Sequence, residues 1–332
     1  MKKILFRTNG GLGKQIMATA VAKQIRQQYP DATIHVQTSY ADPFYNLGFV
    51  DKYYPMNPVP YFYEEHKDFE VLETEAYLDL GFRSGEKHLV EAWCERLGLD
   101  VPKTNQGTLI LDEEERNYAR QNLIQMKLDR PLIAIQISGG TSYYEPMKAQ
   151  DPFKTKHYRD YQFESAQELV NSIIKSGMGA VIQIGLPTEP KLQNCFHLPD
   201  NQIIGPRQLF SLLDMCNYGI FIDSFCQHAW AALGKEKGIV LWGGTNPATL
   251  GYASNINLIN KNSCKTLHCN RPNTFMNDFV GNGSFWKCPN AECMNFKSER
   301  IVGTLQGLID AELKAQKPES EMQLVEDAEV VK

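Results

Sequence analysis

Polar side chains with the chemistry to bind a phosphate follow an apolar run in the second half of the chain. Asp223 and Ser224 come directly after Ile222, and an alanine-rich helix is expected from His228. A second apolar run then ends in the turn Gly243–Thr245. Backbone N–H groups at a helix N-terminus attract anions, and short polar residues at a strand end reach a ribose or a phosphate. The stretch therefore predicts either a nucleotide-phosphate cradle or an ordinary helix capped by Asp223 and Ser224.

The same residue types follow another apolar run, which covers residues 132–137. The residues after it are Ser138, Gly139, Gly140 and Thr141. Ligands of open α/β sheets bind at the carboxyl ends of parallel strands, so these residues are predicted to contact a ligand. Three cations come soon afterwards, Lys154, Lys156 and Arg159. At least one of them, with Lys156 as the candidate, is expected to contact phosphate, and a solvated basic surface is the other interpretation.

A third strand end carries an acidic residue. Gly185 and Glu189 follow the apolar run at 180–184. A carboxylate in this place accepts hydrogen bonds from both hydroxyls of a ribose, as acidic residues do in dinucleotide-binding folds. A glutamate that is favoured in the first turn of a helix by the helix dipole is the other interpretation.

A glycine cluster lies near the N-terminus. It consists of Gly10, Gly11 and Gly13. A dinucleotide fingerprint would need glycine in place of Ile16, and a P-loop would need glycine in place of Thr8 and a hydroxyl in place of Gln15. Both patterns fail. The cluster predicts a strand-to-helix turn that lets a ligand approach the backbone, with Lys14 beside it, or else a tight turn with a solvated lysine.

Four of the eight cysteines form two equally spaced pairs. They are Cys264, Cys269, Cys288 and Cys293. Four residues lie within each pair and eighteen lie between the pairs. Four thiolates suit zinc, although a gap of about two residues is more usual in zinc knuckles. A structural zinc site, disulfides and free thiols all remain open, and a reducing cytoplasm favours zinc over disulfides.

The elements that must position these residues alternate along the chain. Apolar spacing predicts a helix over 15–28 and a strand over 32–37, with an irregular loop at 53–63. After the break at 129–131, strands are expected at 132–137, 180–184, 219–222 and 238–242, and helices at 163–175, 208–216 and 228–233. This order predicts an α/β fold of two Rossmann-like doubly wound domains that face each other across a cleft. The expected domains are 1–128 and 129–312, with a cysteine-rich insertion at 261–295 and a disordered acidic tail at 313–332.

Composition narrows the classes of function. The 332 residues are 42% hydrophobic, with a formal net charge of −5. No apolar run approaches the roughly 20 residues needed to span a bilayer, and the N-terminal apolar stretch is too short for a signal peptide, so a cytoplasmic protein is expected. The negative charge disfavours nucleic acid as a partner without excluding it.

The order of the motifs resembles the heptosyltransferase-like glycosyltransferases, of the lipopolysaccharide-heptosyltransferase type. That family has an Asp-Ser/Thr-Gly motif, a histidine three residues later, an alanine-rich helix and a Gly-Pro-Thr turn. The similar residues here are Asp223, Ser224, Phe225, His228 and 243–247. Lys156–Tyr158 is similar to the family's Lys-x-Trp, 185–189 to its turn with a glutamate, and 9–20 to its acceptor-side loop. The resemblance covers about residues 1–312 and is strongest from 130 to 250.

The resemblance implies the GT-B fold and transfer of a hexosyl, heptosyl or pentosyl group from a nucleotide-sugar donor to an acceptor hydroxyl. It implies inversion, no metal or other cofactor in catalysis, and a saccharide or glycolipid acceptor. The expected donor-binding residues are Ser138, Gly139, Gly140, Thr141, Lys156, Gly185, Glu189, Asp223, Ser224, Phe225, Gln227 and His228. The expected acceptor-side residues are Gly10, Gly11, Gly13 and Lys14. Lys14 and His228 are the candidates for a catalytic role, and bracing of the helix start is the other role open to His228.

The chain departs from the family pattern at two positions. Phe225 stands where the family has glycine, and Lys14 stands where it has the aspartate that is implied to be the base. An ammonium group can neutralise a diphosphate but cannot accept a proton, so the base is expected elsewhere, at 64–66 or at Asp79. The glycine loop also resembles that of fucosyltransferases, but their His-x-Arg-Arg motif is not found.

Three other classes of function remain open. A glycosyltransferase that modifies hydroxylated bases in DNA would use Lys14 and the aromatic stretch at 53–63, where bases could stack. A non-catalytic sugar-nucleotide-binding module would explain the missing aspartate. A nicotinamide-dependent oxidoreductase is disfavoured because the glycine fingerprint fails.

Overall fold

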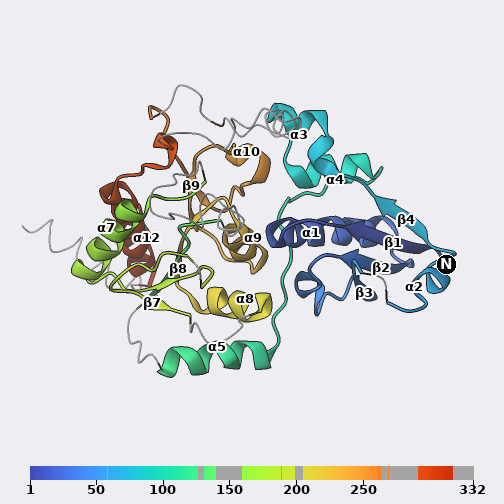
Figure 1. The fold of residues 1–332 in the computed structure, drawn as a ribbon, viewed down its shortest axis with the longest axis horizontal. Coiled ribbons are helices and arrows are strands. Elements are labelled where there is room, and N and C mark those ends of the chain that lie inside the picture. Colours follow the sequence, from blue (N-terminus) through green and yellow to red (C-terminus); the bar gives the residue numbers. More distant parts are fainter. Residues whose placement is uncertain are drawn as a thin grey trace, which may run out of the picture.

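The computed structural model describes residues 1–57, 59–125, 131–139, 159–187, 189–198, 205–263, 268 and 291–316. Within them, two parallel sheets form the centres of two domains that lie side by side (Figure 1). The first sheet has the strand order β3-β2-β1-β4 and the second has the order β10-β9-β8-β5-β6-β7. None of the described helices is long and apolar enough to cross a bilayer.

The first domain contains the N-terminal sheet, the long helix α1 and several short helices. Its strands are β1 (Lys3–Thr8), β2 (Thr33–Thr38), β3 (Lys52–Pro55) and β4 (Glu70–Glu73), and its helices are α1 (Leu12–Gln28), η1 (Asp42–Phe44), α2 (Phe62–Glu65), η2 (Ala76–Leu78), α3 (Leu80–Ser84) and α4 (Leu89–Arg96). Alternation along β2 places Ile34 and Val36 in the core that α1 and α4 cover, together with Trp93 of α4. His35 points to the other face, where its ring lies against His66. Successive side chains of a strand point to opposite faces, so β2 contributes buried residues to both sides of the sheet.

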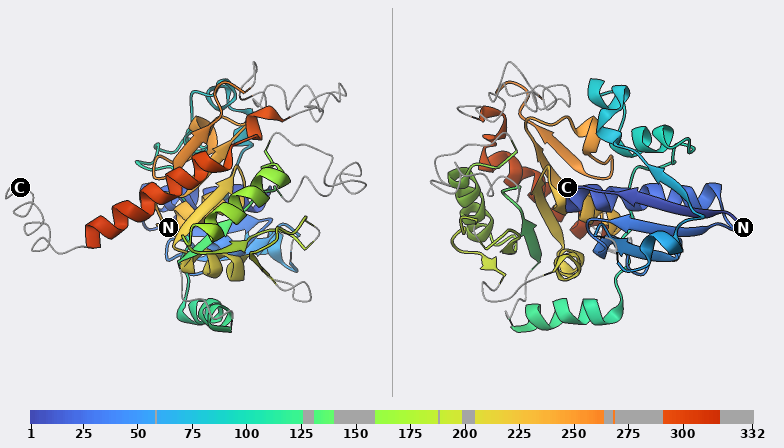
Figure 2. Two further views of the ribbon diagram at one scale, coloured as in Figure 1. Left: turned by 90° about the vertical axis from the view of Figure 1, so that its left-hand side faces the viewer. Right: turned by 45° about the vertical axis from the view of Figure 1, so that its right-hand side comes forward.

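The second domain is a three-layer sandwich. Its strands are β5 (Leu132–Ile135), β6 (Ala180–Gln183), β7 (Phe196–His197), β8 (Tyr218–Ile222), β9 (Ile239–Trp242) and β10 (Ile256–Ile259), and its helices are α7 (Phe163–Lys175), α8 (Pro206–Met215), α9 (Phe225–Ala232), α10 (Pro247–Leu250), η4 (Glu292–Met294) and α12 (Ser298–Gln316). Ile133 and Ile135 pack on the face that α7 and α12 cover. Leu132 and Ala134 pack on the opposite face, under α8 and α9. Figure 2 shows α7 and α12 lying together on the outer side.

Each sheet contains a point where the strand order reverses. In the first sheet the chain runs outward from β1 to β2 and β3, and then returns to place β4 on the other side of β1. In the second sheet it runs from β5 to β6 and β7, and then returns to place β8 on the other side of β5. Ligands of doubly wound sheets bind outside the carboxyl ends of the strands at such switch points. Ligand sites are therefore expected at the ends of β1 and β4 and at the ends of β5 and β8.

The two domains meet through helices α1 and α9, which pack against each other (Figure 1). The connecting chain at 105–110 is bonded to both. The backbone N–H of Thr108 donates to the Thr19 hydroxyl on α1 at 2.8 Å. The next N–H, that of Leu109, donates to the carbonyl of Ala232 at the end of α9 at 2.9 Å.

A buried arginine adds a second connection at the junction. Arg207 of α8 forms an ion pair with Glu115, at 2.6 Å from Nε to Oε1. Its guanidinium also donates to the carbonyl of Ile110 at 2.5 Å and to that of Asp42, in the first domain, at 3.0 Å. Glu115 belongs to α5 (Glu113–Gln125), which packs against α8.

Most predicted elements lie within a few residues of the observed ones, with three differences. The region 53–63 was expected to be irregular, which is wrong, because it holds parts of β3 and α2. Helix α9 begins at Phe225 rather than His228, since Phe225 and Cys226 already pack into the core under α8. Helix α12 continues to Gln316, into the first residues of the predicted acidic tail. The remainder of that tail lies outside the described residues, and the division at 128/129 stays a prediction.

Candidate functional site

The ends of β5 and β8 are linked by a hydrogen bond between side chains. The Gln136 amide, just after β5, donates to the Ser224 hydroxyl, just after β8, at 3.2 Å. Ser224 is the N-cap residue of α9, but its side chain makes no capping bond to the helix backbone. Asp223 and Ser224 therefore stand at the switch point of the second sheet, and the Ser224 hydroxyl is not occupied in capping the helix.

A cation lies beside these strand ends. Arg159 donates from Nε to the Asp223 carbonyl at 2.9 Å, its Nη2 bonds the same oxygen, and its Nε lies 3.6 Å from the Asp223 carboxylate. A Cβ on Gly139 would lie 3.6 Å from Arg159 Nη2, so the glycine turn and the guanidinium are neighbours. The Gly139 N–H donates to Asp160 at 3.0 Å. A guanidinium presented next to a helix N-terminus is suited to a phosphate group.

Two predicted donor residues on α9 are engaged within the protein. Gln227 donates from its amide to the Leu250 carbonyl at 3.0 Å. His228 is 4% exposed, and its Nδ1 lies 2.9 Å from the Tyr252 hydroxyl. Burial, followed by the charges of His88 and Arg159, lowers the pKa of His228 to about 3, so the ring is neutral at pH 7. These contacts support the bracing role for His228.

Phe225 is the first residue of α9 and packs partly buried against the core under α8. The predicted ribose partner, Glu189, is 5% exposed, and its carboxylate lies against Gly185, where a Cβ would collide with it. Its charge is close enough to Cys226 to raise the pKa of that thiol, after the larger effect of burial. Glu189 therefore lies near the first turn of α9, although β5 separates the strands β6 and β8 that precede these residues.

The glycine loop of the first domain reaches the same helix. A Cβ on Gly13 would lie 2.9 Å from His228 Cδ2 and 3.5 Å from the Phe225 Cα, so only glycine allows this approach. Gly10 has φ of +132°, a conformation that side chains rarely adopt. Gly11 precedes the first residue of α1 and has no such close neighbour. The first turn of α1 thus contacts the first turn of α9 across the domain junction.

Lys14 is neither solvated nor directed at an open phosphate site. Its side chain is 7% exposed, and Nζ lies 2.9 Å from both carboxylate oxygens of Glu75. The ammonium also lies over the rings of Tyr77 and Trp93, at 4.9 and 5.2 Å from their centroids. Glu75 follows β4, so this ion pair joins the two strand ends at the switch point of the first sheet.

Three of the four residues suggested as replacements for the missing base have other roles. Glu65 forms an ion pair with Lys52 at 2.8 Å. His66 is buried against His35, with 2.9 Å between ring nitrogens. Asp79 accepts from the first N–H groups of α3 as its N-cap. Glu75, the carboxylate that does lie at the site, was missed because no motif marks it and the strand before it was not predicted.

Several predicted site residues lie outside the described part of the chain. They are Gly140, Thr141, Lys156, Cys264, Cys269 and Cys288. Ser138 is buried next to Gly139, and Cys293 is also buried. Across the described residues, no group of three or more His, Cys, Asp or Glu side chains is placed to hold a metal ion. The cysteine site stays a prediction.

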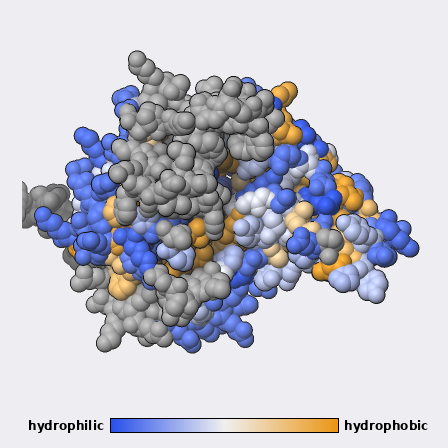
Figure 3. Space-filling view, in the orientation of Figure 1, coloured by the Kyte–Doolittle hydropathy of each residue, from blue (hydrophilic) through white to orange (hydrophobic). Residues whose placement is uncertain are grey.

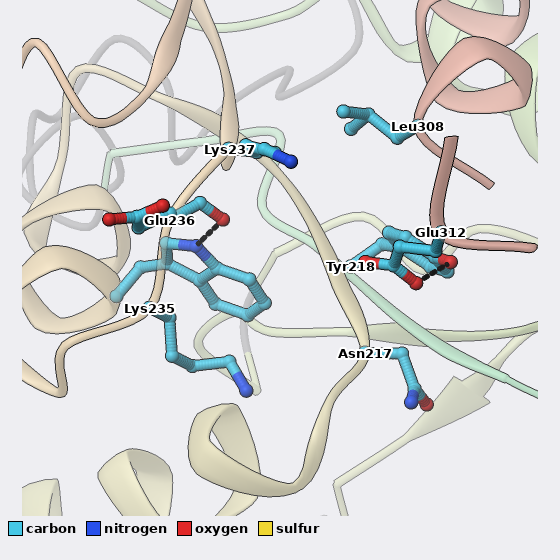
Figure 4. Close-up of a pocket in the computed structure, with 8 residues that line it drawn as sticks. Asn217, Tyr218, Lys235, Glu236, Lys237, Leu308 and Glu312 are labelled. Carbon is cyan, nitrogen blue, oxygen red and sulfur yellow. Dashed lines mark hydrogen bonds between the residues drawn. The ribbon is translucent and has the colours of Figure 1, made fainter. Parts of the chain in front are cut away.

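A cavity of about 300 Å³ lies away from these strand ends (Figure 4). It is bordered by Tyr218, the first residue of β8, and by Lys237, shortly before β9. The Tyr218 hydroxyl donates to Glu312 of α12 at 2.6 Å, and the Trp230 indole N–H donates to the Glu236 carbonyl at 3.2 Å. Because both strands begin here, the cavity is at the amino edge of the sheet, opposite the switch point.

Comparison with known proteins identifies the fold. No family model and no curated protein matches the chain. E. coli ADP-heptose LPS heptosyltransferase II is similar over 94% of this chain and 99% of its own, at 16% identity and a TM-score of 0.60. A glycosyl transferase of family 9 from Veillonella parvula is similar over 92% of this chain and 97% of its own, at 15% identity and a TM-score of 0.64. The iron-containing dodecameric glycosyltransferase TibC from enterotoxigenic E. coli is similar over 93% of this chain and 76% of its own, at 12% identity and a TM-score of 0.62.

Identities this low establish a shared fold. The predicted fold class, two Rossmann-like doubly wound domains facing each other, is confirmed by the strand orders and by these structural neighbours. The likeness to heptosyltransferases that the motif order indicated is confirmed at the same level, that of the fold.

Proposed function

We propose that the protein is a glycosyltransferase that moves a sugar from a nucleotide-sugar donor to an acceptor hydroxyl, with inversion and without a metal in catalysis. The observation that carries the proposal is the position of the two switch points. The first turn of α1, which follows β1, and the first turn of α9, which follows β8, touch at Gly13 and His228, so a donor on one domain and an acceptor on the other would meet beside this contact. The shared fold with heptosyltransferase II and with the family 9 enzyme supports it.

The second domain would bind the donor. Ser224, the N-terminus of α9 and Arg159 together present a hydroxyl, backbone N–H groups and a guanidinium at one strand edge. Negative charge that builds on a departing nucleoside diphosphate is stabilised by such donors without a metal. Lys156, Gly140 and Thr141 would add to this group, and Glu189 would bind the ribose. ADP-heptose, the donor in the names of two structural neighbours, is the first nucleotide sugar to try.

The first domain would bind a saccharide or glycolipid acceptor. Beyond Glu75, the chain presents exposed apolar side chains, Leu78 at 42% and Leu80 at 77% exposure. Figure 3 shows apolar surface on this domain near α3. Such a surface suits the apolar part of an acceptor. The cytoplasmic location expected from the sequence is part of this proposal.

The DNA-modifying alternative loses one of its two supports. Lys14 was to contact the nucleic acid, but it is buried and paired with Glu75. The non-catalytic alternative predicts donor binding without turnover, so it is separated from the enzyme by the assay that follows.

The test combines binding and turnover. Purified protein is heated with ADP-, GDP-, UDP- and CMP-linked sugars, and release of the nucleotide is measured in parallel. A bound donor raises the melting temperature by an amount that grows with its concentration over Kd. In Arg159→Gln, donor affinity should fall roughly 10- to 100-fold, because a charge-assisted hydrogen bond contributes about 1.5–3 kcal/mol.

Arg120→Gln, at an exposed arginine of α5, serves as the matched control and should bind donors like the wild type. The proposal fails when no nucleotide sugar is bound or turned over. It also fails when Arg159→Gln binds the donor as tightly as Arg120→Gln does.

A further inference from the structure

Glu75 is an exposed carboxylate that is held by a buried lysine. Its side chain is 47% exposed, yet it is fixed by a lysine that is only 7% exposed. Its oxygens accept two bonds from Lys14 Nζ and one from the N–H of Tyr77, at 3.1 Å. A carboxylate has about four acceptor positions, so three bonds leave capacity on Oε2 for a further donor.

Glu75 stands at the carboxyl end of β4, directly across the switch point from the glycine loop. It also lies near the predicted donor side. Burial, then the charges of Asp223 and Glu75, raise the pKa of Tyr77, and Arg159 lowers it. Tyr77, two residues after Glu75, is thus close enough to Asp223 and Arg159 of the other domain for their charges to act on its phenol. A sugar held between the two switch points would have Glu75 on its acceptor side.

Other acidic groups in the described part of the cleft are committed to structural contacts. The Asp223 carboxylate is 5% exposed and lies beside Arg159. Asp160 accepts from the Gly139 N–H, and Asp79 caps α3. Glu73, two residues before Glu75, forms an ion pair with Arg7 at 2.8 Å. Glu75 differs from Glu73 in its partner, because it is held by a buried lysine whereas Arg7 is about one-third exposed.

We propose that Glu75 is the general base of the transfer and that Lys14 is its positioning residue; this rests on the proposed function. The acceptor oxygen forms a bond to the anomeric carbon while the bond from that carbon to the diphosphate oxygen breaks. The bonding pair leaves with the nucleoside diphosphate, and the hydroxyl proton passes to Glu75 Oε2. Lys14, in the first turn of α1, then holds in place the base that follows the neighbouring strand β4.

The experiment uses Glu75→Gln, Lys14→Met and the double variant, with Glu73→Gln as the matched control. The donor is ADP-heptose, or another nucleotide sugar that the binding test identifies. Nucleotide release from it is measured together with donor binding by thermal shift. Loss of general-base catalysis typically costs about 10²–10⁴-fold. Glu75→Gln should lose that much kcat and bind donor within about twofold of wild type, and Glu73→Gln should match wild type in both.

The double variant separates a base from a structural ion pair. If Glu75→Gln is inactive because it leaves the buried Lys14 without its ion-pair partner, then Lys14→Met removes that unpaired charge and the double variant regains activity. When Glu75 is the base, the double variant stays as inactive as Glu75→Gln, while Lys14→Met alone loses less. Azide adds a second readout in Glu75→Ala, because this anion attacks the anomeric carbon without a proton to remove and should restore nucleotide release as the glycosyl azide forms.

Glu75→Gln with wild-type kcat, recovery in the double variant, or no azide rescue would each overturn the assignment of Glu75 and leave the proposed function intact. A wild-type protein that neither binds nor turns over nucleotide sugars would instead overturn the proposed function.

Discussion

Alanine in place of Gly13 is expected to strain the junction between the domains. The new Cβ would lie 2.9 Å from His228 Cδ2, whereas carbon atoms in optimal contact are about 3.5–4.0 Å apart. The ring has little room to move, because it is 4% exposed and bonded to Tyr252 at 2.9 Å. Overpacking of this kind costs about 1–3 kcal/mol. In the first turn of a helix, alanine also gains up to about 1 kcal/mol over glycine.

Gly303→Ala separates these effects, since Gly303 lies in α12 and a Cβ there meets no atom within 4 Å. Urea unfolding followed by circular dichroism should show Gly303→Ala about 0.5–1 kcal/mol more stable than wild type, and Gly13→Ala about 1–3 kcal/mol below Gly303→Ala. In a His228→Ala background the obstructing ring is gone, so Gly13→Ala should then behave like Gly303→Ala. Equal stabilisation by both alanines in the wild-type background would refute the packing of Gly13 against His228.

Two further predictions concern pH and metal. Burial is the main cause that lowers the pKa of His35 and His88 to about 4 and of His228 to about 3, so the unfolded chain binds their protons first as pH falls below about 6.5. The free energy of unfolding should therefore be highest near neutral pH and fall by about 2 kcal/mol per histidine between pH 7 and 5; a flat urea-unfolding profile over this range would contradict it. Elemental analysis of protein purified without added metal should find one zinc per chain, lost in Cys293→Ser. Iron, which TibC is described as containing, or no metal at all would disprove the zinc assignment.

The parts of the fold with regular apolar spacing were predictable. Helix α7 was placed at its observed bounds, because its apolar residues recur on one face. The edge strands were not predicted. Strand β4 reads EVLE, with its Val71 half exposed, and β3 reads KYYP, so neither shows the apolar run that marks a buried strand.

The site was predictable where strand ends carry recognisable residues. Asp223 and Ser224 follow a fully buried strand and precede a helix, and the sequence predicted both elements. The Lys14–Glu75 pair was not, because 61 residues separate its members and the strand that presents Glu75 was missed. An interaction between residues so far apart depends on the topology of the sheet rather than on local sequence.

The bonds of the connecting chain affect how the molecule responds to a protease. A linker between two domains is ordinarily the first place to be cut, but here Thr108 and Leu109 are hydrogen-bonded to α1 and α9. Cleavage needs several residues of extended, accessible backbone, and residues 105–109, which are buried or partly buried, do not offer it. Cutting should therefore begin before them, at the mostly exposed residues 100–104, and a fragment that starts near residue 105 would keep the linker on α9 but expose the strip of α9 that α1 covers in the intact chain.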